Sequence, residues 1–135
     1  MEVGGFVMHS ILRSFMLAAG FACYVAAAHA QGMGMTFFGA SGLPLTTGDF
    51  SRMAKAADPL LNDETIPIGT VQSWSNPKSG NSGTITLEDR FTYDYEGKTL
   101  PCRKLKYHTV IQNYANPYNL RLNRCKVADG RWLLI

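Results

Sequence analysis

The fold is decided by a central stretch of the chain, residues 84–112, which read TITLEDRFTYDYEGKTLPCRKLKYHTVIQ. Apolar and polar side chains alternate on both sides of the segment 94–98. A period of two is typical of a half-buried β-strand, and the segment Asp94-Tyr95-Glu96-Gly97-Lys98 is typical of a turn. The stretch therefore predicts two antiparallel strands joined by a short turn.

The alternation also assigns side chains to faces of the predicted sheet. In residues 84–93 the apolar residues Ile85, Leu87, Phe91 and Tyr93 share one parity, which Asp89 interrupts. In residues 102–112 the inward set is Leu105, Tyr107, Thr109 and Ile111, and the outward set is Lys104, Lys106 and His108.

Strand patterns continue on both sides of this stretch. Residues 65–74 alternate and predict an earlier strand, and residues 75–83 are rich in the turn formers Asn, Pro, Ser and Gly. Residues 118–127 predict a fourth strand, and Asp129-Gly130 is a hairpin signal before a fifth strand at 131–135. Consecutive strands joined by short turns favour an antiparallel meander.

One helix is predicted ahead of the strands, at residues 49–61. Its apolar residues recur at spacings of three and four, which is the helical period. They are Phe50, Met53, Ala54, Ala57, Leu60 and Leu61. Thr46 followed by Asp49 resembles a capping box, and Pro59 and Asn62 are expected to mark the end. The predicted fold class is α+β, mainly β: one N-terminal helix packed on a small antiparallel meander sheet of about five strands.

The first 30 residues predict a secretory signal peptide. Arg13 precedes an apolar run at 15–28, which is too short to span a bilayer comfortably, and Ala28-His29-Ala30 suits a signal peptidase. Cleavage after Ala30 would leave Gln31 as the first mature residue. Two alternatives stay open: an uncleaved membrane anchor, and a lipoprotein acylated at Cys23.

The rest divides into two parts. Residues 31–48 predict a Gly-rich flexible leader, and residues 49–135 predict the domain. No segment of the mature chain is expected to be a transmembrane helix. The mature cysteines are Cys102 and Cys125, which in an exported protein predict a disulfide; closing a loop of roughly 22 residues contributes about 3 kcal/mol. The alternative of two free thiols stays open.

Five segments form a joint pattern: residues 53–61, 68–70, 74–84, 101–103 and 125–132. Together they resemble the 17 kDa surface antigen family of alphaproteobacterial outer-membrane and envelope proteins, and the similarity covers about residues 49–134. The resemblance implies an envelope location and a small antiparallel domain, and it implies no activity. The chain departs from some members because it has no convincing lipidation cysteine and no long glycine-zipper segment ahead of the domain.

No catalytic, cofactor or metal site is expected. His108 shares its parity with lysines and is interpreted as a surface residue, and a zinc site would need a carboxylate besides it and the two cysteines. No serine has a nucleophile context. Trp74 and Trp132 are interpreted as packing residues, with a carbohydrate-stacking platform as the alternative.

The charge is uneven along the chain. Residues 101–135 hold seven basic residues and one acid, a net charge of +6, whereas residues 31–100 have a net charge of −3. If they share a sheet face, five basic residues predict a polyanion patch: Arg103, Lys104, Lys106, Arg124 and Lys126. The alternative is a solvated face whose cations pair with acids from the first half.

Two functional hypotheses follow. The first is a non-enzymatic exported envelope protein, a structural or binding module of the periplasm or outer membrane, with lipopolysaccharide, cell wall and outer-membrane components as candidate partners and no nucleic acid. The second is a small exported hydrolase of cell wall or glycan that uses the acids of residues 88–96 with the tryptophans as a sugar platform. A weaker third is an accessory subunit that pairs through a sheet edge. The sequence does not indicate an oligomeric state.

Overall fold

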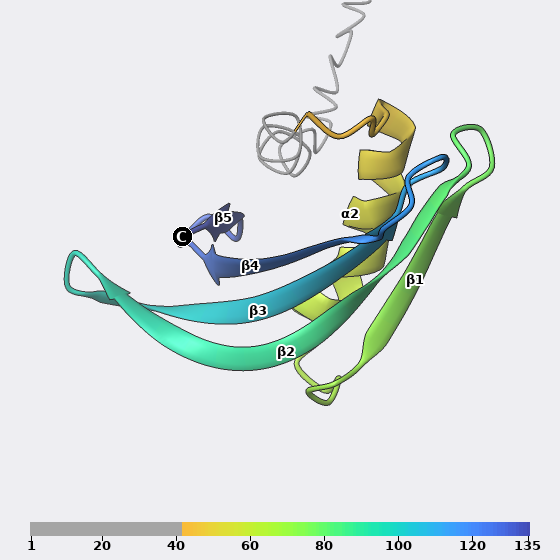
Figure 1. Ribbon diagram of the computed structural model, residues 1–135. Coiled ribbons are helices and arrows are strands. Elements are labelled where there is room, and N and C mark those ends of the chain that lie inside the picture. Colours follow the sequence, from red (N-terminus) through yellow and green to blue (C-terminus); the bar gives the residue numbers. More distant parts are fainter. Residues whose placement is uncertain (1–41) are drawn as a thin grey trace, which may run out of the picture.

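The structure, a computed structural model, describes residues 42–135. The elements are α2 (Thr47–Asn62), β1 (Val71–Asn76), β2 (Asn81–Tyr95), β3 (Lys98–Val110), β4 (Tyr118–Lys126) and β5 (Trp132–Leu134). The strands form one antiparallel sheet in the order β1-β2-β3-β4-β5, which confirms the predicted helix and meander. Figure 1 shows a curved sheet, with α2 against one end and the β2–β3 hairpin reaching beyond the helix at the other.

The strand register divides the sheet into two faces, because directly paired residues of neighbouring strands point to the same side. Leu87, Leu105 and Leu122 are direct partners across β2, β3 and β4, and all three are buried. They form one core cluster with four residues of α2: Met53, Ala57, Leu60 and Leu61. We call this side of the sheet the helix face and the other side the far face; Lys104, Lys106 and His108 lie on the far face, as predicted.

The helix begins at the predicted cap. Thr46 Oγ1 accepts a hydrogen bond from Asp49 N at 3.2 Å, and the Asp49 side chain accepts one from Thr46 N at 2.7 Å. These reciprocal bonds form the capping box and satisfy amides that have no partner within the helix. The expectation that Pro59 marks the end is wrong, because Pro59 lies inside the helix and Asn62 is its last residue.

The first strand is shorter than predicted. It begins at Val71 rather than at 65, since residues 63–70 form turns in which Thr70 N donates to Pro67 O and Gly69 has a φ of +94°. Ile68, which the predicted strand included, is 55% exposed. The turn that follows is also shorter, because Asn76 pairs with Asn81 and only residues 77–80 connect β1 to β2.

A β-bulge between Leu87 and Asp89 changes the second strand. The extra residue moves every later side chain of β2 to the opposite face. Phe91 and Tyr93 therefore lie on the far face, opposite Cys102 and Leu100, and Tyr93 is 43% exposed. The parity that Phe91 and Tyr93 share with Ile85 and Leu87 in the sequence therefore does not put the four residues on one face, and the bulge lies at Asp89, where the pattern is interrupted.

The predicted signal peptide and residues 31–41 of the predicted leader lie outside the described residues. Residues 42–48, also assigned to the leader, contact the domain. Leu45 packs against the core, and Pro44 O accepts a hydrogen bond from Asn81 Nδ2 at 3.3 Å.

Candidate functional site

Cys102 and Cys125 are direct partners on β3 and β4 and form a disulfide, as predicted. Both residues are fully buried on the far face. The bond joins β3 to β4 within the basic C-terminal region and holds the register in which the two strands pair. Every basic side chain on these strands is positioned by that register.

Three arginines are aligned across the sheet on the helix face. Arg90 of β2 is the direct partner of Arg103 of β3, and Arg103 is the direct partner of Arg124 of β4. Like charges directly opposite one another destabilise a sheet. We call these three residues the arginine row, and its repulsion must be offset by neighbouring groups.

The segment after α2 supplies part of that compensation. The Glu64 carboxylate accepts two hydrogen bonds from Arg103 Nη2, both at 2.6 Å, and Arg103 itself is only 4% exposed. Arg90 Nη2 donates to the carbonyl oxygens of Ile66 and Asp63. These acceptors lie just beyond the helix C-terminus, where the helix dipole also favours cations.

The positive charge of Arg124 has fewer acceptors than the charges of Arg90 and Arg103. Three ion pairs are found among residues 42–135, Arg103–Glu64, Arg121–Glu88 and Arg131–Asp129, and Arg124 belongs to none of them. The Nε atoms of all three members of the row are buried without a hydrogen-bond partner. Buried polar atoms of this kind are uncommon in native proteins, so each requires an explanation.

Arg124 lines a cavity of about 270 Å³ between α2 and the β4–β5 turn. The apolar part of its wall is formed by Ala54, Ala57, Leu61, Trp132 and Leu133, and the polar part by Asp58, Asn62, Arg124, Asp129 and Arg131. We call it the Arg124 cavity. It combines an apolar wall with a guanidinium, which is a planar fork suited to carboxylates and phosphates.

Trp132 is held in this wall by several contacts. Its Nε1 donates to Asn62 Oδ1 at 2.9 Å, which connects β5 to the end of α2. The Arg103 guanidinium lies 5.4 Å from the ring centroid, and Lys126 Nζ lies 5.8 Å from it. Cations at these distances are attracted to the ring face. The indole therefore gathers positive charge beside the cavity.

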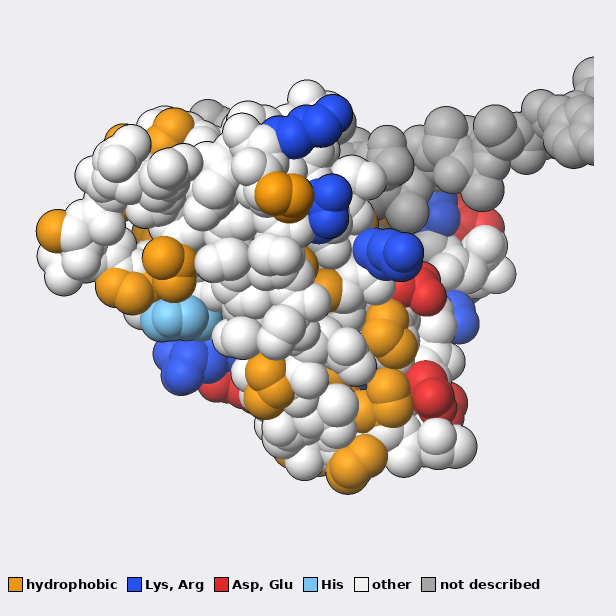
Figure 2. All heavy atoms as spheres, turned by 90° about the vertical axis from the view of Figure 1, so that its right-hand side faces the viewer, with side chains coloured by type: hydrophobic (Ala, Val, Ile, Leu, Met, Phe, Trp, Pro, Cys, Tyr) orange, Lys and Arg blue, Asp and Glu red, His pale blue; other side chains and the backbone are white. Residues whose placement is uncertain are grey.

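The five residues of the predicted polyanion patch do not share one face. Arg103, Arg124 and Lys126 lie on the helix face, whereas Lys104 and Lys106 lie on the far face. Figure 2 views the molecule from the β1 side and shows basic side chains at several separate positions on that surface. The strand pairing also places Arg90 on the helix face beside Arg103. The sequence did not indicate this, because the face of Arg90 depends on the bulge that precedes it.

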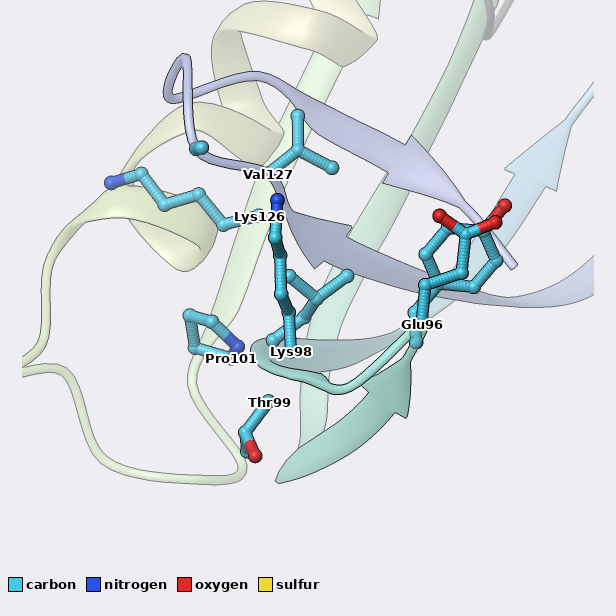
Figure 3. Close-up of a pocket in the computed structure, with 9 residues that line it drawn as sticks. Glu96, Lys98, Thr99, Pro101, Lys126 and Val127 are labelled. Carbon is cyan, nitrogen blue, oxygen red and sulfur yellow. The ribbon is translucent and has the colours of Figure 1, made fainter.

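A second pocket, of about 520 Å³, lies between the tip of the β2–β3 hairpin and the segment after β4. Its walls include Tyr95, Leu100, Pro101, Val127 and Ala128. In Figure 3 Lys98 extends from the hairpin toward Val127, whereas Glu96 lies on the opposite side of the pocket. Glu96 is the only acid of residues 88–96 in this pocket, and neither tryptophan lines it.

The remaining candidates for chemistry have structural roles. His108 Nδ1 hydrogen-bonds Asn119 Oδ1 at 2.9 Å on the far face, and Glu88 pairs there with Arg121 at 2.8 Å. Trp74 is buried in the core cluster. Within residues 42–135 no group of three His, Cys, Asp or Glu side chains is placed to hold a metal ion.

A buried polar network around Asp49 was not foreseen as a whole. Its carboxylate accepts hydrogen bonds from Asn76 Nδ2 at 2.8 Å, Ser79 Oγ at 2.6 Å and Asn81 Nδ2 at 3.0 Å, besides those from Thr46. Burial opposes ionisation, but hydrogen bonds from Ser79, Thr46, Asn81 and Asn76 outweigh it and lower the pKa of Asp49 to about 2. The capping box was the only sequence signal for this site.

Comparisons with protein-family models, curated proteins and solved structures find no match to this chain. None of the helices among the described residues has the length and apolar character needed to cross a membrane.

Proposed function

We propose that the chain is a non-enzymatic module exported to the cell envelope, in the periplasm or at the outer membrane, and a relative of the 17 kDa surface antigens. The observation that carries the proposal is the disulfide between Cys102 and Cys125. Such bonds persist in oxidising compartments and are rare in the cytosol. The signal-like residues 1–30 supply the route to such a compartment.

A binding role within the envelope is supported by the charge on the helix face. The arginine row runs across β2, β3 and β4, and Arg124 lines the Arg124 cavity together with Arg131. Among residues 42–135, Glu64 is the one carboxylate that forms an ion pair with the row. Lipopolysaccharide, cell wall and other outer-membrane components carry anionic groups that such a surface attracts.

The hydrolase alternative has less support. It requires acids of residues 88–96 beside a tryptophan. Glu88 and Asp89 lie on the far face, whereas Trp74 and Trp132 lie on the helix face. Neither of the two described pockets joins an acid of this group to a tryptophan.

Cell fractionation tests the proposal. The full chain and a matched variant lacking residues 1–30 are expressed in a bacterial host with an outer membrane and followed by immunoblot. We expect the full chain to co-sediment with outer-membrane or cell-wall material and the shortened variant to stay in the cytosol. A full chain recovered in the cytosol, or wholly free in the periplasm with no envelope component bound, would contradict the proposal.

A further inference from the structure

We propose that the Arg124 cavity binds a free carboxylate carried by a small apolar group. The inference rests on the proposed function only for the cellular source of the ligand. Its first support is Arg124, which lines the cavity, has a buried Nε without a hydrogen-bond partner and forms no ion pair with any described carboxylate. Guanidinium groups bind carboxylates through two parallel N–H···O hydrogen bonds, so a carboxylate in the cavity would give Arg124 the anionic partner that it lacks among residues 42–135.

The charges on the cavity wall leave Arg124 to pair with an anion. Arg131 is paired with Asp129 at 2.6 Å, so the other charged lining residues are Arg124 and Asp58, and Asp58 accepts a hydrogen bond from Asn62 Nδ2 at 3.0 Å. A carboxylate brings a single negative charge to Arg124, whereas a doubly charged phosphate would be repelled more strongly by Asp58 and Asp129 at the cavity wall.

The size and lining define the rest of the ligand. A volume of about 270 Å³ lies just below the range of drug-sized ligand sites, roughly 300–1,000 Å³, so the cavity suits a small ligand. Ala54, Ala57 and Leu61 of α2 face the occupant with apolar surface, and Trp132 closes the other side. The polar Nε1 of Trp132 is already bonded to Asn62, so this wall offers no further donor from the indole.

Two sources present this chemistry in an envelope. One is the terminal D-alanine of a cell-wall peptide, and the other is a protein C-terminus that ends in L-alanine. Both carry a free carboxylate next to a small apolar side chain, and they differ in chirality at that carbon.

Titration of the purified, oxidised protein tests the inference. N-acetyl-D-alanine, N-acetyl-L-alanine, the neutral N-acetylalaninamide and inorganic phosphate are added separately, and backbone amide shifts are followed by NMR. We expect at least one of the two acids to saturate, with shifts confined to residues 54–62 and 124–133. The preferred enantiomer then identifies the source.

The variants separate a binding role from a structural one. Arg124→Ala is expected to weaken binding of the preferred acid about tenfold or more, the loss expected for hydrogen bonds to a charged group. Arg124→Lys should retain part of the affinity. The matched control is Arg121→Ala, on the same strand but facing the far face, and it should change affinity by less than about twofold.

Four results would overturn the inference: no saturable binding of either acid, equal binding of the neutral amide, tighter binding of phosphate, or shifts centred on the hairpin pocket at residues 95–101. If Arg124→Ala does not fold, the amide shifts of the wild-type protein still show whether the acid binds in the Arg124 cavity. These outcomes are independent of where the chain is found in the cell, so this inference and the proposed location fail separately.

Discussion

The carboxylate of Asp49 in the first turn of α2 accepts a hydrogen bond from Asn81 Nδ2 at 3.0 Å, at the start of β2. This contact links two residues 32 positions apart and fastens the N-terminus of the helix to the β1–β2 hairpin. It belongs to a set of five hydrogen bonds to one buried carboxylate. The orientation of α2 on the sheet therefore depends on a polar contact as well as on apolar packing.

Replacing Asp49 by Asn should destabilise the fold. The amide keeps the shape, but its NH2 group would face donors from Asn76, Ser79 and Asn81. We expect Asp49→Asn to lower the free energy of unfolding by about 2–4 kcal/mol in urea denaturation, the cost of lost charge-assisted bonds and unpaired buried donors. Asp58→Asn, on the exposed side of the same helix, should change it by less than about 0.5 kcal/mol. Equal effects of the two changes would contradict the role of Asp49.

The stability should also depend on pH through Asp49. Its pKa is about 2 in the folded protein, below the ordinary value of 3.8, so ionised Asp49 stabilises the fold above about pH 4. That contribution, about 2 kcal/mol, is lost as pH falls from about 4 to 2. Urea midpoints measured across this range should fall more steeply for the wild type than for Asp49→Asn. Parallel pH profiles would show that the pKa of Asp49 is not lowered by folding.

Removing the disulfide should cost a large part of the stability. The cysteines are 23 positions apart, and a cross-link of this span contributes about 3 kcal/mol. The double variant Cys102→Ser/Cys125→Ser should unfold at correspondingly lower urea concentration. Reductant should lower the wild-type midpoint toward that of the double variant and leave the double variant unchanged. If reductant does not change the urea midpoint of the wild type, the disulfide does not contribute this stability.

Gly83 should tolerate no side chain. It is the direct partner of Trp74, and a Cβ placed there would lie 2.3 Å from His108 O and 2.9 Å from Trp74 Nε1. We expect Gly83→Ala to destabilise the protein by about 1–3 kcal/mol, as overpacking does, with a change in Trp fluorescence. Ser82→Ala, the neighbouring change on the far face, should stay within about 0.5 kcal/mol. A neutral Gly83→Ala would show that the indole moves freely.

Much of the fold could be predicted from local patterns. The period of two in residues 84–112, the Asp129-Gly130 turn and the helical spacing of Met53, Ala57 and Leu60 each encode one element and its buried side. The bulge after Leu87 could not be placed in the same way. Asp89 shows that the alternation breaks, but the face of Phe91 and Tyr93 depends on the pairing with β3, which is a long-range property.

The candidate site shows the same division. The cysteine pair and three of its basic residues, Arg103, Arg124 and Lys126, could be named from composition and parity. Arg90 pairs with Arg103 only because the bulge sets the register of β2 after Leu87. Glu64 reaches Arg103 only because α2 packs on the sheet and places the segment after it beside β3. The Asp49 network was missed because two asparagines in a turn-like sequence gave no sign that they would be buried.

Intact-mass measurement shows whether the chain is exported and oxidised. The protein is isolated from native envelope material with a thiol-blocking reagent present throughout. The exported chain should begin at Gln31, carry no blocking group and be two hydrogens lighter than its reduced form. A chain that keeps residues 1–30, or one in which Cys102 and Cys125 are both alkylated, would contradict this expectation.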